Sequence, residues 1–191
     1  MEALDALQAA NAEFESRLGK VTGEHWTLQT PCPEWDVRAL VNHMLLGTRM
    51  SVHVLAGMPR EEVISYLDDD LMTDNDDPVA SFASLTDQMV DGFSGPNGLA
   101  GIVEHPGGDF PREMFCGFRV ADGACHAWDL ARAIGVEEEL NADLVQWAWD
   151  DANPRGDMLA ATGMFGDGAS GTLGDDAPLQ SRYLDLMGRR P

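Results

Sequence analysis

The sequence predicts an all-α protein whose helices pack into a bundle. Apolar residues recur at three- and four-residue spacing in several segments, which indicates amphipathic helices. Most of these segments are followed by glycine, proline, asparagine or aspartate, residues that typically end helices. A chain of 191 residues can bury the core of one domain. We expect residues 1–191 to form a single domain, with residues 155–191 as a loop-rich C-terminal extension packed on it.

In the first half of the chain, capping residues and helix breakers mark where helices begin and end. Asp36 and Asp77 each precede a helical pattern and are candidate N-cap residues. Two prolines within residues 25–35 predict an extended loop between the first two helices. The predicted helices of this half cover residues 2–18, 37–56, 60–72 and 79–93.

The second half is predicted to contain the longest helix and a less regular C-terminal part. Residues 99–105 favour a short extended segment, and Asp109 is a candidate N-cap, with Pro111 in the first helical turn. Residues 163–178 are rich in glycine and aspartate, which predicts a segment without regular structure. The predicted helices of this half cover residues 112–134, 141–151 and 179–188.

Composition and charge limit the partners. The formal net charge of −21 repels nucleic-acid phosphate, and no basic stripe offsets it. No apolar run approaches the roughly 20 residues that cross a bilayer, and the acidic first residues do not resemble a secretory signal. Cys32, Cys116 and Cys125 form no C-x-x-C pair, which indicates reduced thiols, the last two packed in the interior. We expect a cytoplasmic monomer or homodimer that binds a small-molecule substrate but neither nucleic acid nor membrane.

His43 lies in the middle of the second predicted helix. Ala39, Leu40, Gly47 and Met50 share its face, so the side chain is expected to point toward the core, with space beside the ring at Gly47. Considered alone, His43 is best interpreted as a buried histidine with one hydrogen bond.

The longest predicted helix carries a carboxylate and an imidazole on one apolar face. Asp122 and His126 are four residues apart, which places their Cβ atoms roughly 5–6 Å from each other. The pair could form a simple hydrogen bond, or it could bind a metal ion together with a second histidine. Asp129 could accept a hydrogen bond from His126 and orient it. Alternatively, Asp129 faces solvent or pairs with Arg132.

Two motifs and the C-terminal end resemble one known family. Residues 30–43, Thr-Pro-Cys-Pro-Glu-Trp-Asp-Val-Arg-Ala-Leu-Val-Asn-His, resemble the opening motif of actinobacterial DinB-like proteins. These proteins are related to the N-terminal domain of mycothiol-dependent maleylpyruvate isomerase. Residues 126–135, His-Ala-Trp-Asp-Leu-Ala-Arg-Ala-Ile-Gly, resemble their second motif, and residues 177–191 resemble the tail of a compact subgroup.

The resemblance implies a DinB-like four-helix bundle with extra short helices, an irregular C-terminal segment and three metal ligands. Carried over to this chain, the ligands are His43, His126 and the acidic residue four positions before His126, which is Asp122. The isomerase has glutamate at that acidic position, and the shorter aspartate draws the carboxylate oxygen back by one methylene. The isomerase also has a separate C-terminal domain that contributes to thiol recognition, and we expect this chain to be too short for it.

The candidate metal ligands and the family resemblance together favour a metal-dependent enzyme that uses a low-molecular-weight thiol of the mycothiol type as cosubstrate. It would act as a transferase or isomerase on a small electrophilic molecule, although no catalytic residue can be assigned. Zinc suits two imidazoles and a carboxylate, with nickel, iron and manganese as alternatives. The competing hypotheses are a non-catalytic metal- or ligand-binding protein of the same fold and a purely structural bundle.

Other polar residues favour structural or solvent-exposed positions. The acidic residues at 68–77 lack the glycine and glutamate spacing of an EF-hand, so a solvated loop is favoured. His53 is rotated off the helix face that carries the site histidine. His25 lies in a predicted loop, and for His105 a surface loop is favoured over a pocket mouth. The glycines of residues 163–174 do not follow a strand and therefore form no phosphate loop.

Overall fold

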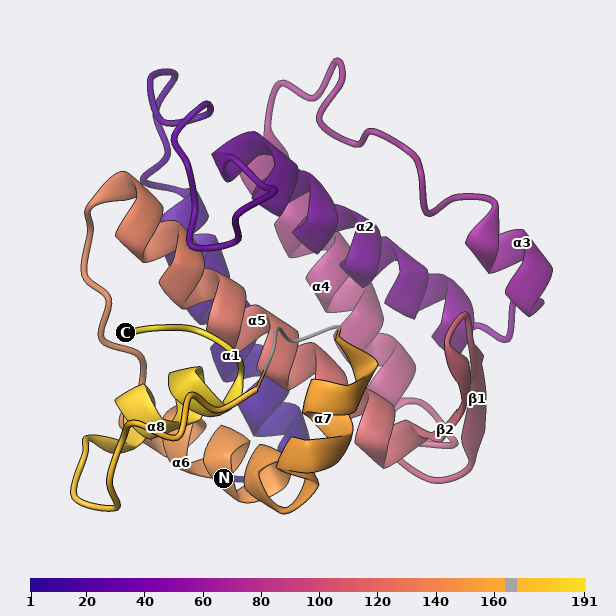
Figure 1. The fold of residues 1–191 in the computed structure, drawn as a ribbon. Coiled ribbons are helices and arrows are strands. Elements are labelled where there is room, and N and C mark those ends of the chain that lie inside the picture. The colour runs from indigo at the N-terminus through magenta and orange to yellow at the C-terminus, as the bar shows by residue number, and fades with distance from the viewer. Residues whose placement is uncertain (164–167) are drawn as a thin grey trace.

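The computed structural model describes residues 1–163 and 168–191 and is mostly helical. Four long helices contact one another in a closed cycle, with α1 against α4 and α5, and α2 against the same two helices (Figure 1). The all-α, DinB-like prediction is confirmed. No described helix is long and apolar enough to cross a membrane. The four long helices are α1 (Ala3–Leu18), α2 (Val37–Leu55), α4 (Pro78–Ser94) and α5 (Arg112–Ile134).

The predicted helix starts and ends are largely confirmed. The Asp36 carboxylate accepts a hydrogen bond from the Ala39 amide at 2.8 Å, and Asp77 caps α4 in the same way. Gly135 ends α5 in the left-handed conformation, with φ of 70°, which glycine adopts without strain. Shorter helices complete the chain, namely α3 (Arg60–Ile64), α6 (Ala142–Ala152), α7 (Gly156–Thr162) and α8 (Leu179–Leu186), with a 3₁₀ turn over Asn153–Arg155.

The helix predicted over residues 60–72 is much shorter in the structure. It ends after Ile64, and the acidic residues that follow bind α2 instead of continuing the helix. Arg38 donates to Asp70 at 2.8 Å, and Arg49 donates to Asp69 at 2.7 Å. Carboxylates at the C-terminal end of a helix oppose its dipole, whereas these arginine contacts stabilise them.

The predicted cap at Asp109 is wrong. Residues 102–111 form a hairpin of β1 (Ile102–His105) and β2 (Gly108–Pro111), and Asp109 pairs with Glu104 in its antiparallel ladder. The helix α5 begins directly after the hairpin. The extended segment predicted over residues 99–105 is therefore one strand of a two-stranded ribbon.

The C-terminal part contains a helix, α7, that was not predicted. Residues 164–167, with Gly166, lie outside the described residues. Of the segment 163–178, which was predicted to lack regular structure, residues 168–178 contain no described helix or strand. The C-terminal tail lies against the end of α5, where Arg132 Nη1 donates to the Arg190 carbonyl at 3.2 Å (Figure 1).

A glycine brings α1 and α5 close together. A Cβ atom on Gly123 would lie 3.2 Å from the Cβ of Ala10, which is tighter than most real contacts of that kind. This close packing fixes the middle of α5, the segment that carries Asp122, His126 and Asp129, against the buried core.

Candidate metal centre

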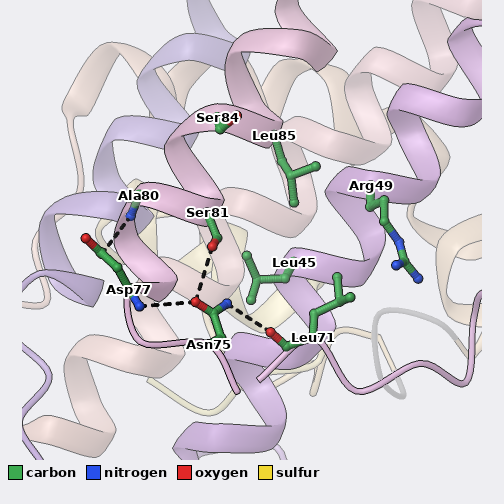
Figure 2. A pocket seen from close by; sticks show the side chains of 9 residues that line it. All are labelled: Leu45, Arg49, Leu71, Asn75, Asp77, Ala80, Ser81, Ser84 and Leu85. Atoms are coloured by element: carbon green, nitrogen blue, oxygen red, sulfur yellow. Dashed lines mark hydrogen bonds between the residues drawn. The ribbon is translucent and has the colours of Figure 1, made fainter. Parts of the chain in front are cut away.

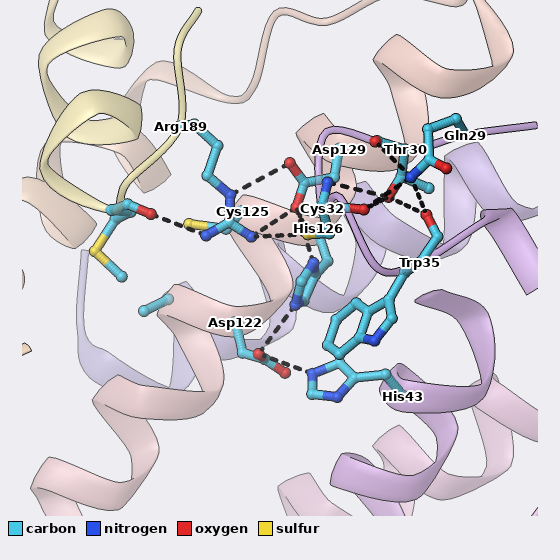
Figure 3. Close-up of polar contacts among 12 residues, drawn as sticks. Gln29, Thr30, Cys32, Trp35, His43, Asp122, Cys125, His126, Asp129 and Arg189 are labelled. Carbon is cyan, nitrogen blue, oxygen red and sulfur yellow. Dashed lines mark hydrogen bonds and ion pairs between the residues drawn. The ribbon is translucent and has the colours of Figure 1, made fainter. Parts of the chain in front are cut away.

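The structure brings His43, Asp122 and His126 together between α2 and α5 (Figure 3). Nε2 of His43 lies 3.3 Å from Asp122 Oδ1, and Nε2 of His126 lies 3.4 Å from the same oxygen. One ligand atom from each residue lies within 4.8 Å of the other two. Asp122 and His126 are buried, and His43 is half-buried at the edge of the group.

Asp129 contacts the other side of the His126 ring. Its Oδ2 lies 2.9 Å from His126 Nδ1, and its side chain is fully buried. A carboxylate only accepts, so Nδ1 carries the hydrogen and Nε2 faces Asp122. The alternatives in which Asp129 faces solvent or pairs with Arg132 do not hold, because Arg132 binds Glu138 and lies over the Trp128 ring.

Arg189, from the C-terminal tail, holds Asp129 in place. Its Nη2 donates to Asp129 Oδ2 at 2.7 Å and lies 3.7 Å from the sulfur of Cys32 (Figure 3). The Cys32 thiol is itself 3.4 Å from Asp129 Oδ2. Cys32, His126 and Asp129 therefore form a second group of potential ligand atoms beside the first.

Arg119 occupies the space that the sequence left beside Gly47. Its Nη1 donates to Asp122 Oδ2 at 2.9 Å, and a Cβ on Gly47 would lie 2.9 Å from that nitrogen. The expected space beside the His43 ring is therefore filled by a guanidinium. Asp122 then uses Oδ2 for Arg119 and turns Oδ1 toward both histidines.

Trp35 covers the histidines from the loop before α2. Its ring centroid lies 4.5 Å from that of His43 and 5.6 Å from that of His126. Gln29 and Thr30 fix the loop by donating to the Trp35 carbonyl at 3.0 and 2.7 Å. The predicted extended loop is thus a wall of the site.

The charges of this group stabilise one another. Burial alone would raise the pKa of Asp122, but Arg119 and the two histidines hold it well below its usual value. Burial alone would lower the pKa of His126, but the carboxylates of Asp122 and Asp129 raise it well above 6.5. Without a bound cation, His126 is therefore an imidazolium between two carboxylates.

The donor set fits a divalent transition-metal ion. Two imidazoles and one carboxylate oxygen, all converging, are a common ligand set for zinc and its neighbours. Three protein ligands leave at least one position for another molecule. A metal ion would replace the proton on His126 Nε2 while Asp129 keeps its contact with Nδ1.

Three cavities reach His43; the smallest, of about 380 Å³, is lined by α2 and the acidic residues 68–70, and the other two are larger. One, of about 890 Å³, is lined by the loop of residues 29–35, His43, His126 and the C-terminal residues 188–190. The other, of about 550 Å³, is lined by His43 and Asp122 together with mainly apolar side chains. His43 lines both, so a cation held here is reachable from either cavity.

The other sequence candidates lie elsewhere. His53 stacks near Tyr66, and His25 accepts a hydrogen bond from the Thr22 amide. Burial raises the pKa of the Cys116 thiol to about 12 and also raises that of Cys125, as expected for packed thiols. The surface loop favoured for His105 is wrong, because its side chain is only 8% exposed and lines the apolar cavity.

Several residues of the site were missed in the sequence. Arg119 precedes Asp122 by three residues on one helix face, a spacing that could have revealed the pair. Trp35 and Cys32 belong to the motif of residues 30–43, but the sequence did not indicate where their side chains point. Arg189 lies 60 residues from Asp129, and no sequence pattern links them.

Comparisons with known proteins place the candidate ligands within one family match, and Arg189 lies beyond it. The family described as Mycothiol maleylpyruvate isomerase N-terminal domain matches residues 7–131, which include the three candidate ligands and Asp129. Two uncharacterized proteins of Mycobacterium tuberculosis, one from each of two strains, are 30% identical over 144 residues. Each match covers 75% of this chain and 74% of the relative. No solved structure matches the chain significantly.

Proposed function

The chain belongs to the mycothiol maleylpyruvate isomerase N-terminal domain family, and on that basis we propose that it is a metal- and thiol-dependent transferase or isomerase. Its substrate would be a small electrophilic molecule, and its cosubstrate a low-molecular-weight thiol of the mycothiol type. Zinc is the favoured ion, with nickel, iron and manganese as alternatives.

One observation carries this proposal: three ligand atoms converge beside two cavities of ligand-binding size. A structural ion pair needs no access from outside, whereas two cavities beside the group give room for two small molecules. A divalent ion held there supplies Lewis acidity, which favours the deprotonated form of a thiol or water.

The chain's own residues would prepare the site. Asp129 keeps the hydrogen of His126 on Nδ1 and so leaves Nε2 available as a ligand. Arg119 holds one oxygen of Asp122 and directs the other toward the histidines. Trp35 packs against His43 and limits its rotation. Each candidate ligand is therefore oriented by a neighbouring side chain of the chain itself.

The larger cavity suits the thiol. Arg132, Arg189 and Arg190 line it, in a chain that has only 12 lysine and arginine residues against 33 acidic ones. Backbone and amide groups of the 29–35 loop lie along the same wall. A polar, hydroxyl-rich thiol would find hydrogen-bond donors and acceptors there, and its sulfur could reach the side of His43 and His126.

Thiol consumption tests the proposal. Chelator-treated protein is reloaded with zinc and supplied with mycothiol and a panel of electrophiles such as epoxides, activated alkenes and haloaromatics. We expect thiol loss above the metal-free control, abolished by H126A. H53A, on the same helix as His43 but outside the site, serves as the matched control and should stay active. If no electrophile of the panel consumed thiol at a metal-dependent rate, the enzymatic proposal would be contradicted.

A non-catalytic role is the second candidate, and two contacts of Asp122 favour it. Asp122 is already bound by Arg119 and His43, so the group can be electrostatically satisfied without an ion. Elemental analysis separates the candidates: a structural ion-pair network predicts no stoichiometric metal in the purified protein. Stoichiometric metal without thiol chemistry would instead favour a metal- or ligand-binding protein.

A further inference from the structure

The apolar cavity of about 550 Å³ at the candidate metal centre has a chemistry of its own. Its walls come from α2, the β1–β2 hairpin, α5 and α7. Packed interiors contain few voids larger than one water molecule, whereas this space of about 550 Å³ lies in the range of ligand-binding pockets. Its apolar walls include Leu46, Met50, Phe110, Phe115, Phe118 and Met158.

The aromatic rings of this apolar cavity come from the hairpin and from α5. Phe110 meets Phe118 edge to face, with centroids 5.4 Å apart and an interplanar angle of 86°. His105 lies between Phe110 and Phe115, with centroids at 5.5 and 5.3 Å. Aromatic walls of this kind favour an aromatic ligand, because aromatic rings pack well against one another edge to face or offset.

His105 and Arg119 add hydrogen-bond donors to the apolar cavity. His105 Nδ1 accepts from the Gly107 amide at 3.0 Å, so a neutral ring carries its hydrogen on Nε2. Burial, followed by the charges of Arg119 and Arg60, lowers the pKa of His105 to about 4, and the ring is neutral near pH 7. Arg119 also lines this cavity.

The charge of Arg119 is already matched. Its Nη1 binds the Asp122 carboxylate at 2.9 Å, and both side chains line the apolar cavity. A second carboxylate would meet the negative charge of Asp122 and would lose its hydration among apolar walls, which is costly. A neutral acceptor, such as a carbonyl oxygen, meets neither penalty.

We propose that the apolar cavity binds the electrophile, and that the electrophile is an uncharged aromatic molecule with one carbonyl-type acceptor group. The aromatic body would pack against Phe110, Phe115 and Phe118, and the acceptor would face His105 or Arg119. This inference rests on the proposed function where it calls the ligand an electrophile. The binding of the ligand to the apolar cavity does not require a metal. The proposal therefore excludes small, highly charged organic acids as the electrophilic substrate of this chain.

Calorimetry on metal-free protein tests the ligand class with three probes. 2-Acetonaphthone is an uncharged aromatic ketone, 2-naphthoate has a similar body with a carboxylate, and maleate is a small dianion. We expect 2-acetonaphthone to bind at least tenfold more tightly than 2-naphthoate, and maleate to show no saturable binding. Tighter binding of either acid would overturn the proposal.

Cavity-filling variants locate the binding. Met158 is 41% exposed on α7, so M158W should fold and fill the apolar cavity from its rim. M50W fills it from α2. Leu85 provides the matched control, because it lines a separate cavity of about 560 Å³ between α2 and α4 (Figure 2). We expect M158W and M50W to weaken ketone binding at least tenfold and L85W to leave it unchanged.

The same samples distinguish this inference from the proposed function. Zinc uptake by M158W should equal that of the unchanged protein, because Met158 is not a ligand. Ketone binding without zinc uptake would leave the cavity assignment standing and remove the metal-dependent function. Zinc uptake with ketone binding that M158W and M50W do not weaken would remove the cavity assignment alone.

Discussion

His126 donates its Nδ1 hydrogen to Asp129 across 2.9 Å, and this contact turns Nε2 toward Asp122 and His43. Asp129 is fully buried and is itself held by Arg189 from the C-terminal tail. The orientation of one candidate ligand is thus set by residues that lie 3 and 63 positions further along the chain.

The first prediction concerns this contact. D129N should weaken zinc binding about 10- to 100-fold, as is typical when the hydrogen-bond partner of a ligating histidine is lost. The amide nitrogen would also face the Arg189 guanidinium. Competition with a fluorescent chelator measures the affinity.

D185N is the matched control for D129N. Asp185 is also buried and also contacts an arginine, Arg190 at 3.3 Å, but it lies on α8 and does not touch the candidate ligands. Equal zinc affinity in D129N and D185N would show that Asp129 does not support a metal site.

The second prediction concerns the aspartate at the acidic position. D122A should weaken zinc binding more than D122E, because glutamate keeps a carboxylate and the family isomerase uses one of that length. Elemental analysis after dialysis, with H43A and H126A alongside, measures the retained metal. Equal loss in D122A and D122E would argue that Asp122 is not a ligand, and stoichiometric metal retained in H43A and H126A would exclude the site.

The third prediction is a loss of stability of the metal-free protein at alkaline pH. The pKa of His126 is raised well above its ordinary value of 6.5 in the folded state, mainly by Asp122 once burial is overcome. Between these two pKa values the folded state holds a proton that the unfolded state has released. The stabilisation is therefore complete below pH 6.5 and is lost as pH rises through the folded pKa.

Denaturant unfolding with a chelator present, at pH values from 6 to 10, measures that loss. H126Q should remove the part of the decline between pH 6 and about pH 8, and H53Q should keep it. Above that pH the buried thiols of Cys116 and Cys125, whose pKa values are raised, add a decline that both variants keep. His105 does not contribute above pH 6.5, because its folded pKa of about 4 lies below the ordinary value, so its effect is confined to more acidic solutions. Identical pH profiles for H126Q and the unchanged protein would contradict the assignment.

The fourth prediction concerns the packing of α1 on α5. G123V should destabilise the fold by about 1–3 kcal/mol, the usual cost of forcing extra methyl groups into a packed interface. Even the first added carbon would lie 3.2 Å from Ala10 Cβ. Thermal unfolding measures the change, and G23V is the control because no atom lies within 4 Å of a Cβ placed on Gly23. A shift no larger than that of G23V would contradict the close approach.

The sequence by itself determined the four long helices, the caps at Asp36 and Asp77 and the one-turn pairing of Asp122 with His126, because these depend on neighbours within a few residues. It also identified the family through two motifs, which named His43 as a candidate before its distance to α5 was known. Its errors were local as well: Asp109 joined a strand ladder, and residues 65–72 bound α2 instead of extending a helix.

Only the tertiary structure decided what surrounds the ligands. Arg189 reaches Asp129 because the chain folds its last residues onto α5. The apolar cavity exists because α2, the hairpin, α5 and α7 leave space beside His43, and the larger cavity lies between the 29–35 loop, α5 and the C-terminal residues. Such contacts join residues that are distant in the chain, and their positions follow from the packing of whole helices. Helical periodicity specifies which face of a helix is buried, but not which distant side chain meets it.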